Sequence, residues 1–260
     1  MLLHLLAAML VAGHPGSSGG ALTPAPRIAN SEQLLTAMRR RYSGRWYRSA
    51  TFVQTTSETQ PNGTVKEETW LEAMTFPGKL RIDFSQPGGE KGAIFARDSQ
   101  FMIDSGKLTT TVARPHPLLL LGFDVYFLPV PQTMTTLRQL GVDLSKLHTD
   151  VWRGRSVYVV GADSSDLHSR QFWVDRDRLL FVRMLQPGGR DSTKTSDIHF
   201  DDYRRLGGGW MAYEVEFLLD GKRRVLERYR DVRANVRLDR ALFDPARWHT
   251  APHWHPARLR

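Results

Sequence analysis

The chain has 260 residues, a formal net charge of +9 from 36 Lys and Arg against 27 Asp and Glu, and no cysteine. With 41% hydrophobic and 24% charged residues, the composition is that of a globular protein of one large or two small domains, which argues against disordered, collagen-like and multi-span membrane proteins. The lack of cysteine excludes disulfide scaffolds, thiolate metal sites, cysteine nucleophiles and lipidation at a bacterial lipid-anchor cysteine. The positive charge permits a nucleic-acid, anionic-membrane or acidic partner without selecting one.

The amino terminus is similar to a secretory signal peptide. An apolar run from Leu2 to Ala12 is followed by small residues, which offer cleavage after Ala21 or after Gly13. The run is shorter than the roughly 20 residues that a membrane-spanning helix needs. We therefore expect a signal peptide over residues 1–21, although no Lys or Arg precedes the run, so the true start codon could differ. The alternative is a buried amino-terminal helix of a cytosolic protein.

A linker over residues 22–29 precedes a predicted helix over residues 31–42, where Asn30 and Gln33 have the spacing of a capping box. The periodicity then changes to two, as in Leu80, Ile82 and Phe84, which is typical of half-buried strands. Gly- and Pro-containing turns separate the segments and predict antiparallel neighbours. The predicted strands cover residues 47–56, 65–76, 79–85, 92–97, 100–105, 107–113, 155–162, 169–176, 179–186, 195–206, 209–219 and 223–233.

The series of strands is interrupted over residues 114–150. Prolines bracket an apolar run from Leu118 to Val130, and a short helical pattern follows over Thr133 to Leu140. We interpret this segment as a lid-like insertion. The predicted fold is mainly β: a single curved antiparallel sheet of about 10–12 strands forms an unclosed β-barrel, with the first helix and the insertion covering its concave face. One domain over residues 30–246 precedes a tail over residues 247–260.

The sequence offers little catalytic chemistry. Nucleophile-elbow, phosphate-loop, dinucleotide and His-Glu-x-x-His motifs are all missing from it. Asp197, His199 and Asp201 share one face of a predicted strand and could bind a metal or exchange protons, but a solvated polar face explains them as well. Histidines 249, 253 and 255 lie in the predicted tail. We expect no enzyme activity, no cofactor and no metal; an enzyme built on the Asp197 face is the minor alternative.

Apolar residues exceed what one short helix can cover. The predicted lipid-binding set lies on the first half of the sheet and on the insertion, and it comprises Phe52, Trp70, Met74, Phe76, Leu80, Ile82, Phe84, Ile94, Phe101, Ile103, Leu119, Phe123, Tyr126 and Phe127. These residues could form a plain core. The alternative is a cavity that accepts an apolar ligand, with the Pro-bracketed insertion as its lid.

Several short patterns point to one family. They are Phe52-Val53-Gln54, the strand Pro77 to Phe84, the hairpin Arg97 to Phe101, Phe172 to Asp175, Asp202-Tyr203-Arg204 and Leu242 to Pro245. With these the chain resembles the periplasmic lipoprotein carriers and outer-membrane lipoprotein-sorting proteins of the LolA/LolB-like fold. The resemblance implies an open, curved barrel that shields acyl chains in an apolar cavity. It also implies an Arg before the Pro of the third strand, associated with holding the lid closed, where this chain has Phe76.

The resemblance implies a periplasmic carrier that acts on lipoprotein acyl chains or another lipid. We expect an exported, soluble, non-lipidated monomer, with an envelope membrane protein as a candidate partner and no nucleic acid. The alternative is an RseB-like envelope sensor or interaction module without a transported ligand. The positive charge is local: residues 222–260 hold 11 Lys and Arg against 4 Asp and Glu. We expect a headgroup- or partner-binding patch at Arg223, Arg224, Arg228, Arg230 and Arg233, or else a solvated edge strand.

Overall fold

The computed structural model describes residues 28–255 except 97 and 190, and these residues form one antiparallel sheet of 13 strands with three α-helices. The predicted signal peptide and the last five residues lie outside this range. The strands are β1 (Ser49–Thr59), β2 (Val65–Thr75), β3 (Lys79–Phe84), β4 (Gly92–Ala96), β5 (Ser99–Asp104), β6 (Lys107–Val112), β7 (Leu147–Trp152), β8 (Arg155–Val160), β9 (Gln171–Asp175), β10 (Phe181–Pro187), β11 (Thr195–Leu206), β12 (Gly209–Leu219) and β13 (Lys222–Ala234).

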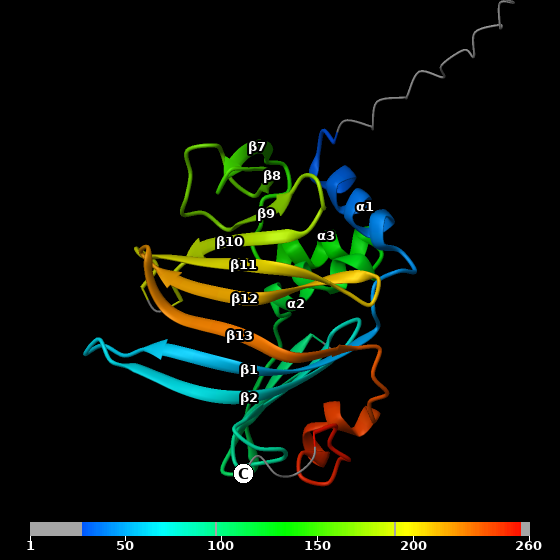
Figure 1. The fold of residues 1–260 in the computed structure, drawn as a ribbon. Coiled ribbons are helices and arrows are strands. Elements are labelled where there is room, and N and C mark those ends of the chain that lie inside the picture. Colours follow the sequence, from blue (N-terminus) through cyan, green and yellow to red (C-terminus); the bar gives the residue numbers. More distant parts are fainter. Residues whose placement is uncertain (1–27, 97, 190, 256–260) are drawn as a thin grey trace, which may run out of the picture.

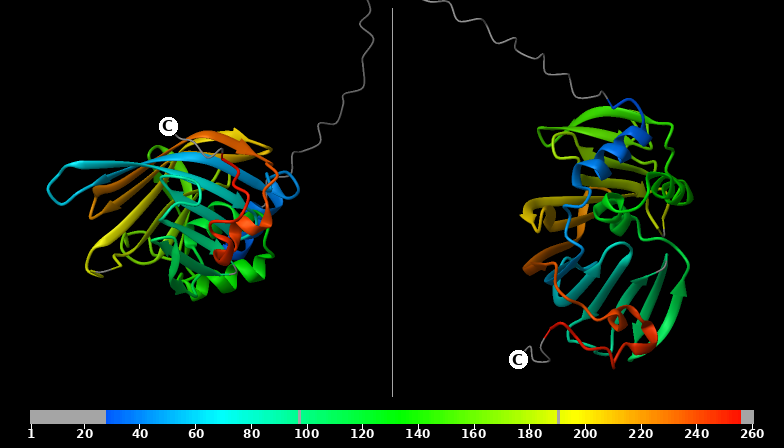
Figure 2. Two further views of the ribbon diagram at one scale, coloured as in Figure 1. Left: turned by 90° about the horizontal axis from the view of Figure 1, so that it is seen from below. Right: turned by 90° about the vertical axis from the view of Figure 1, so that its right-hand side faces the viewer.

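The strand order is β6-β5-β4-β3-β2-β1-β13-β12-β11-β10-β9-β8-β7. Neighbouring strands are hairpin partners throughout, except that β1 pairs with β13 and so joins the two halves of the sheet. The sheet has free edges at β6 and β7 and does not close, which confirms the predicted curved open sheet (Figures 1 and 2). Because β13 has partners on both sides, the alternative that it is a solvated edge strand is wrong.

Strand β7 begins within residues 114–150, for which the sequence predicts a single insertion. It is an edge strand that pairs with β8 alone, and Val151 is 66% exposed. A strand with one partner and little burial does not need an apolar face, so its periodicity is weak. The insertion therefore ends before Leu147.

Helix α1 (Ser31–Tyr42) has the predicted bounds. Asn30 Oδ1 accepts a 2.9 Å hydrogen bond from the Gln33 amide, as in a capping box, and Gln33 Oε1 accepts one of 2.8 Å from the amide of Ala29, the residue before the cap. Leu34, Leu35 and Met38 are buried on one helix face. The insertion carries α2 (Pro117–Gly122), a 3-10 turn η1 (Asp124–Tyr126) and α3 (Val130–Gln139). Among the described residues, no helix has the length and apolar character needed to cross a membrane.

Helices α1, α2 and α3 lie on one face of the sheet, which curves around them (Figure 2). We call this the inner face; it carries Phe52, Met74 and Leu80, and the main hydrophobic core lies between it and the helices. This confirms the prediction that the first helix and the insertion cover the concave face of the sheet. Side chains alternate between the two faces along each strand, so Arg81 and Asp83 lie on the opposite, outer face.

The outer face of the first half is covered by the C-terminal segment, residues 240–255, which includes the turns η2 (Arg240–Phe243) and η3 (Pro245–Arg247) (Figure 1). Trp248 is 3% exposed, and its Nε1 donates a 2.8 Å hydrogen bond to the Gly89 carbonyl. A Cβ at Gly92 would overlap the Trp248 ring, so the ring can pack there only because residue 92 is glycine. Residues 248–255, which the sequence predicts as part of a tail, thus pack against the sheet.

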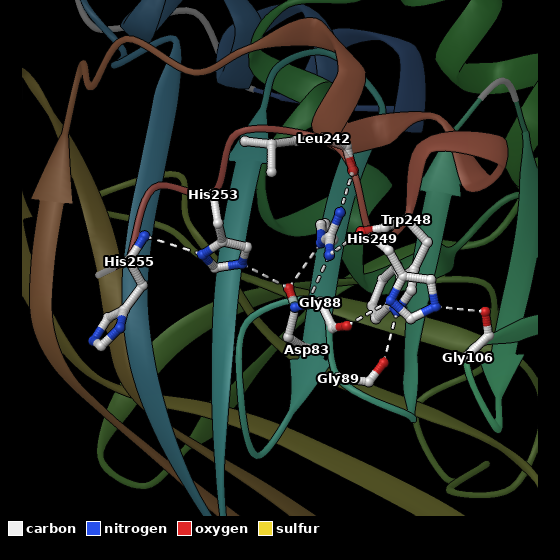
Figure 3. Close-up of polar contacts among 10 residues, drawn as sticks. Asp83, Gly88, Gly89, Gly106, Leu242, Trp248, His249, His253 and His255 are labelled. Carbon is white, nitrogen blue, oxygen red and sulfur yellow. Dashed lines mark hydrogen bonds and ion pairs between the residues drawn. The ribbon is translucent and has the colours of Figure 1, made fainter. Parts of the chain in front are cut away.

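The same segment covers a buried ion pair (Figure 3). Arg81 donates two hydrogen bonds, of 2.7 and 2.8 Å, to the Asp83 carboxylate, and its guanidinium lies 3.9 Å from the centre of a Trp248 ring. His253 Nε2 is 3.1 Å from Asp83 Oδ2. Burial alone would raise the pKa of Asp83, but Arg81 and His253 together hold that pKa below its ordinary value. The pair is fully satisfied, which a buried pair requires to be tolerated.

The strand register shows that three residues of the predicted lipid-binding set lie on the outer face and not on the inner face. Ile94 pairs with Arg81 and with Phe101, and opposite residues of an antiparallel pair share a face. Ile94, Phe101 and Ile103 therefore lie on the outer face, where they pack with Trp248, and not beside Leu80. The inner face of β4 and β5 is formed by Ala93, Phe95 and Met102 instead.

Candidate functional site

A cavity of about 140 Å³ lies between the inner face and α2. Its walls come from β1, β2 and β3 on one side and from β11, β12 and β13 on the other, with α2 above. The lining residues are mainly apolar: Phe52, Glu72, Met74, Leu80, Ile82, His116, Leu118, Leu119, Phe123, Phe200, Met211, Ala212, Val215, Phe217, Glu227 and Tyr229. Six members of the predicted lipid-binding set are among them: Phe52, Met74, Leu80, Ile82, Leu119 and Phe123.

A second, more open cavity of about 330 Å³ adjoins the first and shares Phe217 and Glu227 with it. Trp70, another predicted residue, forms part of its wall. The Trp70 ring packs on Phe84 at 4.5 Å between ring centres, and its Nε1 donates a 3.0 Å hydrogen bond to Glu68. We call the first space the inner cavity and the second the outer cavity. Together the inner and outer cavities extend from residues on β1, β2 and β13 to the space beneath α2.

Phe76, Tyr126 and Phe127 do not line the inner cavity but attach the insertion to the sheet. Phe76 stacks on Phe123 at 5.0 Å and on Phe127 at 5.7 Å between ring centres. Where the family resemblance implies an arginine at the lid, this chain has an aromatic stack. The amide of Gly78 adds a 2.8 Å hydrogen bond to Asp124 Oδ1. Burial raises the pKa of Asp124 to about 7, although that hydrogen bond opposes the shift.

Two carboxylates, Glu72 and Glu227, line the inner cavity, and neither was in the predicted set. Glu72 is 5% exposed, and burial raises its pKa well above the ordinary range, with the charge of Glu227 adding to the effect. Glu227 is half-buried; burial raises its pKa to about 7. Tyr229 donates a 2.9 Å hydrogen bond to it. The sequence does contain a pattern that indicates the position of Glu72. It lies midway between Trp70 and Met74, and in a strand with a period of two all three side chains are on one face.

The predicted arginine patch lies on β13, and its five members are exposed: Arg223, Arg224, Arg228, Arg230 and Arg233. Three of them have acidic partners: Arg223 lies 2.7 Å from Glu216, Arg228 lies 3.0 Å from Glu214, and Arg230 lies 2.7 Å from Asp231. These contacts offset part of the local positive charge.

The second candidate, Asp197, His199 and Asp201, forms an ion-pair network on the outer face. Asp197 accepts two hydrogen bonds from Arg183, of 2.8 and 2.7 Å, and lies 2.9 Å from His199 Nε2. Asp201 pairs with Arg153. The carboxylates are thus engaged by arginines, and the described residues contain no group of His and acidic side chains able to hold a metal ion.

The histidines near the C-terminus hold the C-terminal segment on the sheet. His249 Nδ1 and Nε2 each lie 2.8 Å from a carbonyl oxygen, those of Gly88 and Gly106, and His253 contacts Asp83 (Figure 3). These contacts are structural. They join the C-terminal segment to the β3–β4 and β5–β6 turns.

No family model matches the sequence, and no curated protein matches it by sequence similarity. Solved structures do match. A DUF1329 family protein from Desulfovibrio piger has a TM-score of 0.53 and 12% identity, covering 82% of this chain and 95% of its own. A putative outer membrane lipoprotein-sorting protein domain from Vibrio parahaemolyticus gives 0.53 and 12%, covering 83% and 97%. A LolA superfamily protein from Nitrosomonas europaea gives 0.50 and 9%, covering 83% and 98%. The sheet, its helices and these matches together show that the chain has a LolA-like fold.

Proposed function

We propose that this protein is a periplasmic carrier that shields the acyl chains of lipoproteins or of another lipid. The observation that supports the proposal is the inner cavity: an apolar space that the chain's own side chains leave open beneath α2. Transfer of aliphatic groups out of water is favourable by about 0.8 kcal/mol per CH₂. A chain reaching the inner cavity through the outer one would be removed from water without any covalent chemistry.

The insertion is the element that would open and close the cavity. Helix α2 contributes Leu118 and Leu119 to the cavity wall, and the residue after it contributes Phe123, while Phe76 holds Phe123 and Phe127 against the sheet. Aromatic contacts of this kind are worth about 0.5–1.5 kcal/mol each beyond burial. A lid held by a few such contacts can open without unfolding the sheet.

The arginines of β13 are proposed to contact anionic headgroups or an acidic envelope partner during transfer. No carboxylate lies within ion-pair distance of Arg224 or Arg233 among the described residues, so these two would contribute most. Flotation with anionic vesicles should show reduced binding when both are changed to Glu, and no dependence on them would remove the patch from the proposal.

Ligand uptake tests the carrier function. Delipidated protein is titrated with cis-parinaric acid, whose fluorescence rises in an apolar environment, and one saturable site is expected. Leu118→Trp should fill the cavity from α2 and reduce uptake at least tenfold. Val65→Trp, which places the same side chain at a position 58% exposed and outside both cavities, is the matched control. Absence of saturable uptake by folded wild-type protein would refute the proposal.

One observation supports the alternative sensor or interaction module. Half of the inner face is filled by α1, α3 and the aromatic side chains Tyr42, Trp46 and Tyr126, so the fold is stable there without a ligand. A module of this kind would show no uptake of the probe but would form a stable complex with an envelope protein. The uptake titration therefore separates the two functions.

A further inference from the structure

The two cavity carboxylates have no evident role in holding an acyl chain. Glu72 lies on β2 between Trp70 and Met74, and its carboxylate has no hydrogen bond or ion pair to any described residue. Burying an unpaired carboxylate is costly, and glutamine or an apolar residue would avoid that cost. Glu72 therefore reduces stability in the ligand-free protein, and a ligand group that pairs with it would recover the loss.

The polar groups near Glu72 are mostly acceptors that lack donors. Gln54 lies on β1, between the strands of Glu72 and Glu227, and its Nε2 donates a 2.7 Å hydrogen bond to the Thr56 hydroxyl. Its Oε1 is buried without a partner among the described residues. Tyr229 already donates to Glu227. Tyr229 and Gln54 thus both act on Glu227, while the Glu72 carboxyl and Gln54 Oε1 have no hydrogen-bond partner among the described residues.

Acidic side chains outnumber basic ones on the walls of the two cavities. Among the described residues, no Lys or Arg lines the inner cavity. In the outer cavity, Glu58, Glu68 and Glu227 face a single lysine, Lys66, which pairs with Glu68 at 2.5 Å. The wall that a ligand's polar end would meet is therefore net negative and rich in acceptors, whereas the wall beneath α2 is apolar.

We propose that the inner cavity takes an aliphatic chain that carries an ammonium group, with the chain against α2, β3 and β12 and the ammonium beside Glu72 and Glu227. An ammonium supplies three N–H donors and the opposite charge, which the wall lacks. This inference rests on the carrier function proposed above and names the ligand class of the same cavity.

Proton linkage gives the binding a pH dependence. Burial raises the pKa of Glu227 to about 7 and that of Glu72 well above its ordinary value, so both carboxyls bind protons more tightly than exposed ones do. An ammonium would displace these protons, and affinity should rise as the pH rises from 6 to 8. The other titratable groups that line this cavity are Tyr229 on β13 and His116 at the start of α2, whose pKa burial lowers to about 4, so that it is neutral over this range.

The test compares ligands of equal chain length. Displacement of N-phenyl-1-naphthylamine is measured with dodecylamine, 1-dodecanol and dodecanoate, each below its micelle concentration. At pH 7.5 dodecylamine should displace the probe at a concentration at least tenfold lower than 1-dodecanol, with dodecanoate weakest. The Glu72→Gln/Glu227→Gln variant should lose this preference while keeping its affinity for 1-dodecanol. Glu67→Gln, on the exposed opposite face of β2, is the matched control and should behave as wild type.

Three results would overturn the inference. Equal displacement by the amine and the alcohol in wild-type protein would refute the ammonium site and leave the carrier function standing. Preference for the amine that persists in the double Gln variant would place the selectivity elsewhere. Failure of every ligand, with folded protein verified by circular dichroism, would refute the carrier function together with the inference.

Discussion

The two halves of the inner face are built from the same kind of strand but are filled differently. Over β8–β10 the core is closed by α1, α3 and the stack of Trp46 on Tyr126, whose ring centres are 4.0 Å apart. Over β1–β3 a single short helix, α2, lies above the sheet, and the inner cavity remains. An apolar strand face therefore does not distinguish core from cavity. Whether a core or a cavity forms depends on the helices that lie over that face.

The largest expected effect is in the filled half. Trp46→Ala should lower the free energy of unfolding by about 3–5 kcal/mol, because the side chain is 5% exposed and contacts Tyr42, Tyr47 and Tyr126. Trp46→Phe, which keeps an aromatic ring, should lose clearly less. Urea denaturation followed by far-ultraviolet circular dichroism measures both. A loss below 1 kcal/mol for the alanine variant would show that this half is not tightly packed.

A pH-dependent effect is expected at the boundary between the halves, where Asp124 joins the insertion to Gly78. Its pKa is about 7 in the folded protein and about 3.9 in an unfolded chain, so the folded state binds the proton more tightly. The stability that protonated Asp124 contributes is thus present below pH 4 and is lost as the pH rises through 7, at up to about 1.4 kcal/mol per pH unit.

The Asp124→Asn variant isolates this contribution, since asparagine can still accept the hydrogen bond from Gly78. The stability of the wild type minus that of the variant should decrease between pH 4 and 7, as measured by urea denaturation at several pH values. A difference that is constant with pH, or that increases, would contradict the shifted pKa.

The smallest effect on stability is expected in the hollow half. Leu118→Ala should cost about 1 kcal/mol or less, because Leu118 is only partly buried and already borders a cavity. Uptake of cis-parinaric acid should be kept or increased, since the cavity grows. A loss as large as that of Trp46→Ala would show that this half is packed like the other and would remove the contrast.

Local patterns predicted much of the fold. The capping residues Asn30 and Gln33 and the spacing of Leu34 and Met38 predicted α1, and alternation with Gly-containing turns predicted 12 of the 13 strands. These features depend on residues that are near one another in the chain. The curved open sheet and the cover by the insertion followed from them.

What the sequence could not predict depends on long-range pairing. Ile94 and Phe101 are apolar and alternate correctly, but the face on which they lie is decided by the register with Arg81 and by Trp248, which is far away in the chain. For the candidate site, six residues of the predicted set line the inner cavity. Glu72 and Glu227 were missed because a carboxylate in an alternating strand is ordinarily solvated, although Glu72 shares its strand face with the apolar residues Trp70 and Met74.

The central claim is that the inner cavity holds a lipid. Native mass spectrometry of the protein purified from the cell envelope in a mild, lipid-free buffer tests it most directly. We expect a species heavier than the mature chain by the mass of one lipid, which disappears on delipidation and is not formed by Leu118→Trp but is formed by Val65→Trp. Recovery of the bare chain alone, from cells in which the protein is folded, would contradict it.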